Sequence, residues 1–139
     1  MKLHLENIVI ESDRVIGGNL WFSIAGRCFP EENWYEHVSK VLEIWLPSFL
    51  SFSCGYCDQC QLRLLDGPGE IKLKRYSNGN ITASCIWDHK VEIPETEIEL
   101  HDLLDSMLLG LRYYHRQMYL HKLDFPFGKQ LVQLKHLYK

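Results

Sequence analysis

The stretch EIKLKRYSNGNITASCIW, residues 70–87, decides the fold class of this chain. It contains two runs that are typical of β-strands, residues 70–76 and 81–87, separated by Ser77-Asn78-Gly79-Asn80. Asn-Gly between two strand-like runs is the strongest short-range signal for a tight hairpin turn. The stretch therefore predicts an antiparallel β-hairpin.

A further strand precedes this hairpin. Residues 61–66 are typical of a strand, and Asp66-Gly67-Pro68-Gly69 is a strong turn signal between it and the hairpin. The simplest arrangement is a three-stranded meander. Residues 89–93 either extend its last strand or form another.

The N-terminal region predicts a second hairpin. Apolar residues alternate with polar ones from Leu3 to Ile10, with an irregularity at Glu6-Asn7, and this alternation is typical of a strand. Gly17-Gly18-Asn19 is predicted to be a turn, and residues 20–25 a largely buried strand.

A helix is predicted between the hairpins. Asn33 and Glu36 match a capping box at its start, and Pro47 should end or kink it. The apolar residues that recur at helical spacing are Trp34, Val38, Val41, Leu42, Trp45 and Phe49.

Two helices are predicted at the C-terminal end. The first begins after Pro94, with Thr96 and Glu99 as a capping box, and the second is a short helix around Leu131 and Leu134. The order ββ-α-βββ-α-α predicts an α+β fold. We expect one domain, residues 1–139, with an antiparallel sheet of about five strands and helices packed mainly on one face.

Composition limits the class of protein. The chain has 139 residues, enough for one core without a metal or a disulfide. No apolar run approaches the roughly 20 residues that span a bilayer, and the N-terminus lacks the pattern of a signal peptide. We therefore expect a cytoplasmic protein without membrane association, whose five cysteines are reduced.

Charge is unevenly distributed along the chain. Residues 1–105 carry 17 acids and 9 bases, whereas residues 106–139 carry one acid and 6 bases. The net charge of −3 argues against broad affinity for nucleic acid.

The sequence CGYCDQC, residues 54–60, raises the alternative of a metal site. Cys54, Cys57 and Cys60 could supply three thiolates to zinc or an iron–sulfur cluster, with Cys85 or His89 as the fourth ligand. Structural zinc sites usually supply ligands in pairs, however, and three overlapping cysteines converge on one ion only with a sharp turn. We favour reduced cysteines in a loop and no cofactor.

Motifs for catalysis are missing. The chain contains no phosphate-binding loop, dinucleotide fingerprint, zinc-protease motif or nucleophile elbow. The cysteines and histidines show no spacing that identifies a Cys–His pair for nucleophilic catalysis. The missing motifs favour a protein that is not an enzyme.

Residues 112–119, RYYHRQMY, interleave bases with aromatic residues. Such a surface can stack on bases and hold phosphates, which gives nucleic-acid binding as a further alternative. The structural interpretation, which the net charge favours, is that the last helix covers Tyr113 and Leu120 and leaves the arginines in solvent.

Acidic residues share one face of the long helix. Glu95, Glu99, Asp102 and Asp105 lie opposite its apolar face. A solvated face is the common explanation, but such a stripe can also steer a basic partner. We expect a protein partner to contact Glu99, Asp102, Asp105, Arg112 and Tyr113.

In size, compact α+β organisation, acidic stripe and lack of catalytic motifs, the chain resembles the small bacterial immunity proteins that neutralise toxins. The turn in LLDGPGEI, residues 64–71, resembles turns in uncharacterised small proteins of that kind. The resemblance implies binding without catalysis to a toxin domain, often a basic nuclease.

Overall fold

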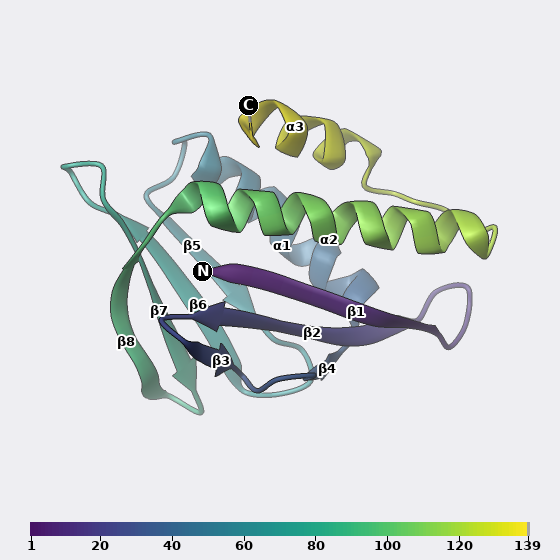
Figure 1. The fold of residues 1–139 in the computed structure, drawn as a ribbon, viewed down its shortest axis with the longest axis horizontal. Helices are drawn as coiled ribbons and strands as arrows, with labels where there is room; N and C mark the ends of the chain where they lie inside the picture. The colour runs from purple at the N-terminus through teal and green to yellow at the C-terminus, as the bar shows by residue number, and fades with distance from the viewer. Residues whose placement is uncertain (139) are drawn as a thin grey trace.

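The computed structural model describes residues 1–138, which form eight strands and three helices (Figure 1). The α+β class with antiparallel pairing is confirmed. The elements are β1 (Lys2–Ile10), β2 (Ile16–Ile24), β3 (Arg27–Phe29), β4 (Tyr35–Glu36), α1 (Val38–Ser53), β5 (Gln59–Arg63), β6 (Gly69–Arg75), β7 (Ile81–Trp87), β8 (Lys90–Ile98), α2 (Leu100–Leu120) and α3 (Gly128–Tyr138).

The predicted meander is present, and β8 extends it to a four-stranded C-terminal sheet in the order β5-β6-β7-β8. At the β6–β7 hairpin Arg75 pairs with Ile81, and Gly79 has a φ of +89°, which glycine adopts at little cost. Ile71 and Leu73 point to the core while Lys72 and Lys74 face solvent, the alternation that a one-sided sheet requires.

The N-terminal hairpin is also present, with its irregularity between Glu6 and Val9. The predicted turn at residues 17–19 is wrong, because these residues lie inside β2 and the chain turns at residues 11–15. A Cβ on Gly17 would lie 2.0 Å from the Tyr35 hydroxyl oxygen, so a side chain there would displace the exposed ring of Tyr35.

The strands form two sheets rather than one sheet of about five strands. β2 pairs with β1, β3 and β4 to make a separate N-terminal sheet. β3 and β4 contain three and two residues, too few to show an alternating pattern in the sequence.

Both predicted capping boxes are wrong. Glu36 lies in β4 and α1 begins at Val38, whereas Thr96 lies in β8 and α2 begins at Leu100. Pro47 lies inside α1 and does not end it. Pro47 and Glu43 are both exposed, so solvent can hydrate the Glu43 carbonyl that the proline leaves without an amide donor.

The helices connect the two sheets. In α1 the Trp45 ring packs 5.6 Å from that of Phe22 in β2, and its Nε1 donates to the Arg63 carbonyl at 2.8 Å in β5. α2 runs along β1, and α3 packs on α2 (Figure 1). One hydrophobic cluster contains residues of both sheets and all three helices.

Candidate functional site

The five residues predicted to contact a partner do not share one open face. Glu99 and Asp102 are exposed at the start of α2, and Arg112 is exposed beside α3. The Tyr113 hydroxyl accepts a hydrogen bond from the Ile8 amide of β1 at 3.3 Å. Tyr113 is therefore half-buried against β1, and the last helix does not cover it as the sequence had suggested.

Asp105 has a partner within the chain. It is half-buried beside Tyr138, and the negative charge of Asp105 raises the pKa of the Tyr138 hydroxyl, which also hydrogen-bonds the carboxylate. The Tyr138 ring stacks on His101 at 4.7 Å. Asp105 therefore helps to attach the end of α3 to α2, and Glu99 and Asp102 are the freer acids.

The structure extends the acidic region beyond the helix. Residues 91–111 contain six acids and no lysine or arginine, and they form most of β8 and the first half of α2. β8 is an edge strand of its sheet. We call the exposed members of this run the acidic edge: Glu92, Glu95, Glu97, Glu99 and Asp102. Sequence reasoning missed its strand half because it treated Glu95 as part of the helix.

Large apolar side chains are exposed on the same helix. Leu109, Tyr119 and Leu120 are 56%, 76% and 64% exposed. Of the aromatic residues in the basic–aromatic segment, Tyr114 is buried in the core and Tyr113 packs on β1. Tyr119 is the exposed tyrosine of this segment, and the ring of the exposed His115 already stacks on Phe125 at 4.1 Å. The segment therefore does not offer the row of free rings expected of a nucleic-acid surface.

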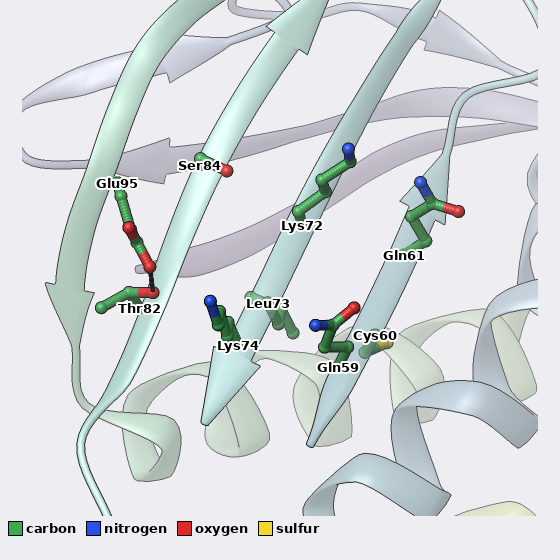
Figure 2. Close-up of a pocket in the computed structure, with 9 residues that line it drawn as sticks. All are labelled: Gln59, Cys60, Gln61, Lys72, Leu73, Lys74, Thr82, Ser84 and Glu95. Carbon is green, nitrogen blue, oxygen red and sulfur yellow. Dashed lines mark hydrogen bonds between the residues drawn. The ribbon is translucent and has the colours of Figure 1, made fainter. Parts of the chain in front are cut away.

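A hollow of about 550 Å³ lies on the outer face of the C-terminal sheet (Figure 2). The side chains of Lys72, Lys74 and Glu95 point outward there, and the helices lie behind the sheet. Lys72 is 3.9 Å from Glu70, and Lys74 lies 4.8 Å from the centre of the Tyr76 ring. The two lysines of this hollow therefore already have favourable neighbours in the chain, a carboxylate for Lys72 and an aromatic ring for Lys74.

Glu95 is anchored at the side of this hollow. The Tyr76 hydroxyl donates to its carboxylate. The Thr82 hydroxyl also donates to it, at 2.7 Å (Figure 2). These hydrogen bonds, that from Tyr76 first, lower the pKa of Glu95. Glu95 is thus held in its ionised form at the junction between the hollow and the acidic edge.

The cysteines considered for a metal site point in different directions. Cys54 caps the C-terminus of α1, and Cys54 and Cys57 are exposed, whereas Cys60 and Cys85 face the core from β5 and β7. His89 lies in the exposed turn between β7 and β8. Within residues 1–138 no group of three or more histidine, cysteine or acidic side chains is placed to hold a metal ion.

Burial also changes the chemistry of two thiols. It raises the pKa of Cys60 to about 11 and that of Cys85 to about 12. The Cys60 thiol is 3.8 Å from the Ser48 hydroxyl, to which it donates. Both thiols are therefore protonated at neutral pH and are poor metal ligands and nucleophiles.

Sequence reasoning missed Glu36, a fully buried acid. Its Oε1 accepts from the amides of His37, Leu65 and Asp66 at 3.0–3.2 Å, and its Oε2 accepts from Trp34 Nε1 at 3.1 Å. Burial raises the pKa of Glu36, and the hydrogen bonds from Trp34, His37 and Leu65 oppose that rise. Glu36 joins β4 to the turn after β5, a role that no local motif signals.

No protein-family model, curated protein or solved structure matched this chain. The resemblance to immunity proteins remains a prediction. Among the described residues, no helix has the length and apolar character needed to cross a membrane.

Proposed function

We propose that this protein is a non-catalytic binding module for a basic protein partner, and specifically that it is a toxin-neutralising immunity protein. The observation that carries this proposal is the acidic edge. Five exposed acids follow one another along an edge strand and the start of the next helix, and no lysine or arginine lies between residues 91 and 111.

Charge of one sign over a continuous segment acts at a distance. It attracts an oppositely charged partner and can raise the rate of association by roughly 10- to 1,000-fold, an effect that salt suppresses. Glu99 and Asp102 also lie near the N-terminus of α2, where acids are favourable, but Glu92 and Glu97 precede the helix. Stabilisation of the helix therefore does not account for the whole acidic edge.

Affinity needs apolar contact as well as charge. Leu109 is more than half exposed on α2, about two turns beyond Asp102, where the acidic edge ends. Apolar side chains beside charged ones are typical of protein interfaces, where the apolar groups slow dissociation and the charges set the rate of association. A basic domain that contacted both the acids and the exposed apolar surface of α2 would associate faster and dissociate more slowly.

The test begins with proteins encoded beside this one, used as candidate partners in a pull-down. For the partner recovered, association is measured by surface plasmon resonance with the double variant Glu99→Lys, Asp102→Lys. We expect association at low salt to slow by about tenfold or more and to depend less on salt. Melting temperature should fall modestly, because two lysines replace acids that are favourable near the N-terminus of α2.

The matched control is Glu31→Lys, Glu32→Lys, which makes the same charge change at two exposed acids outside the acidic edge. It should slow association much less. Equal slowing by both double variants would mean that only net charge matters. Unchanged association in the acidic-edge variant would place the interface elsewhere.

A further inference from the structure

A large hollow lies where the three helices meet. It has a volume of about 1020 Å³ and lies between α1, the end of α2, the start of α3 and the loop joining β1 to β2. We call it the three-helix hollow. Its lining includes the core side chains Leu42, Leu46 and Phe127. Charged and polar side chains make up most of the remaining lining, so the hollow combines an apolar floor with polar walls.

Three polar groups from three different helices line this hollow. His37 Nε2 at the start of α1 and Gln130 Oε1 in α3 are buried, and neither has a hydrogen-bond partner among residues 1–138. Tyr114 of α2 also lines the hollow; it is 1% exposed, and burial raises the pKa of its hydroxyl to about 12. Buried polar atoms in native proteins are nearly always paired, so the unpaired His37 Nε2 and Gln130 Oε1 indicate a ligand in this hollow.

The charges at the hollow favour a neutral ligand. Arg14, Lys40 and Lys122 line it together with the acids Asp13, Glu43 and Asp124, so that bases and acids are equal in number. Lys40 and Glu43 lie 3.5 Å apart. A charged ligand would lose hydration on binding and would find no net opposite charge in the hollow. This loss of hydration is costly in a partly buried site.

We propose that the three-helix hollow binds an uncharged amphipathic small molecule, with an apolar body against Leu42, Leu46 and Phe127. Its polar head both donates and accepts hydrogen bonds, as a carboxamide does. The donors of this head pair with Gln130 Oε1 and His37 Nε2, and its acceptor pairs with the Tyr114 hydroxyl. The site is separate from the acidic edge, so the two proposals can fail independently.

Benzamide is the probe, because it combines an apolar ring with a carboxamide. Benzoate and toluene are the matched ligands: benzoate has nearly the same shape but is charged and has no donor, and toluene has no polar head. Binding is followed by ¹⁵N–¹H NMR at the amide side chain of Gln130 and the backbone amides around the hollow. We expect saturable shifts with benzamide and at least about tenfold weaker binding of benzoate and toluene.

Variants identify the groups responsible. Gln130→Leu and Tyr114→Phe each remove one hydrogen-bonding group and should weaken benzamide binding about three- to tenfold. Gln133→Leu, at an exposed position of the same helix, should leave it unchanged. Thermal melts confirm that each variant is folded. If Tyr114→Phe is unfolded, Gln130→Leu alone tests the proposal. The proposal is overturned if benzamide gives no saturable shift, if toluene binds equally well, or if Gln130→Leu binds benzamide like the wild type.

Discussion

At the scale of the residue, Glu36 is the clearest case of a side chain whose role depends on distant parts of the chain. Its carboxylate serves four N–H donors, two of which lie about thirty positions further along the sequence, at Leu65 and Asp66. A buried donor that loses its acceptor costs about 1–3 kcal/mol. Glu36 is therefore a structural residue, although a buried acid is also a common feature of active sites.

Glu36→Ala should lower the free energy of unfolding by about 2–4 kcal/mol, since it leaves several buried N–H groups unpaired. Glu36→Gln should cost less, because one oxygen remains for the three backbone amides. In that variant the new amide faces Trp34 Nε1, which is also a donor. Urea denaturation measures the free energy of unfolding of each variant and checks that Glu36→Ala costs more than Glu36→Gln.

The control for this prediction is the Trp34→Phe background, which removes the donor that faces Oε2. Glu36→Gln should be less costly there than in the wild type. An equal cost in both backgrounds would show that the clash with Trp34 does not determine the effect.

Thiol reactivity provides a second prediction at this scale. Cys28, Cys54 and Cys57 are exposed, whereas Cys60 and Cys85 are buried with raised pKa values. Iodoacetamide at pH 8 should therefore modify three cysteines of the folded protein quickly and the other two only in denaturant, as read by mass spectrometry. Rapid modification of Cys60 in the native protein would contradict its position in the core.

At the scale of the element, two aromatic rings pack closely against the turn between β5 and β6. A Cβ on Gly67 would lie 2.7 Å from the Trp87 ring and 3.0 Å from the Trp34 ring. These rings meet edge to face at 5.5 Å. Gly67 in LLDGPGEI thus provides space for two tryptophans, Trp34 just before β4 and Trp87 at the end of β7.

Gly67→Ala should lower the free energy of unfolding by about 1–3 kcal/mol, the usual cost of overpacking. The smaller side chain of Trp87→Leu should relieve part of that cost in the double variant. Gly128→Ala is the control, because a Cβ there meets no atom within 4 Å. Calorimetry would contradict this account if Gly67→Ala melted like the wild type.

At the scale of the whole molecule, α1 makes the two sheets depend on each other. Trp45, fully buried, contacts Phe22 of the N-terminal sheet and donates to the Arg63 carbonyl of the C-terminal sheet. Neither sheet has a complete core without this helix. We therefore expect the chain to unfold as one cooperative unit.

Trp45→Ala should cost about 3–5 kcal/mol, as is usual for removal of a large buried aromatic residue. Amide hydrogen exchange should show protection falling by a similar factor in β2 and in β6. Ile44→Ala, on the exposed side of the same helix, should change stability by less than about 0.5 kcal/mol. Loss of protection in one sheet alone would show that the sheets unfold separately.

Local patterns were sufficient for much of this fold. The Asn78-Gly79 turn, the alternation in β6 and the apolar spacing of α1 and α2 depend on residues close together in the sequence, so their elements could be predicted. Other short-range patterns gave wrong predictions. Gly17 and Gly18 resemble a turn, yet they lie in a strand because Gly17 pairs with Val9 of β1 and Gly18 with Glu36 of β4.

The sequence by itself determined the α+β class, the two hairpins, the three helices and the run of acids from Glu92 to Asp105, because each depends on neighbouring residues. Only the tertiary structure decided the separation into two sheets, the burial of Glu36, the divergent positions of the cysteines and the meeting of His37, Tyr114 and Gln130. These features arise from contacts between residues far apart in the chain. Whether a polar side chain is buried, paired or exposed depends on which distant segment packs against it, and no local pattern carries that information.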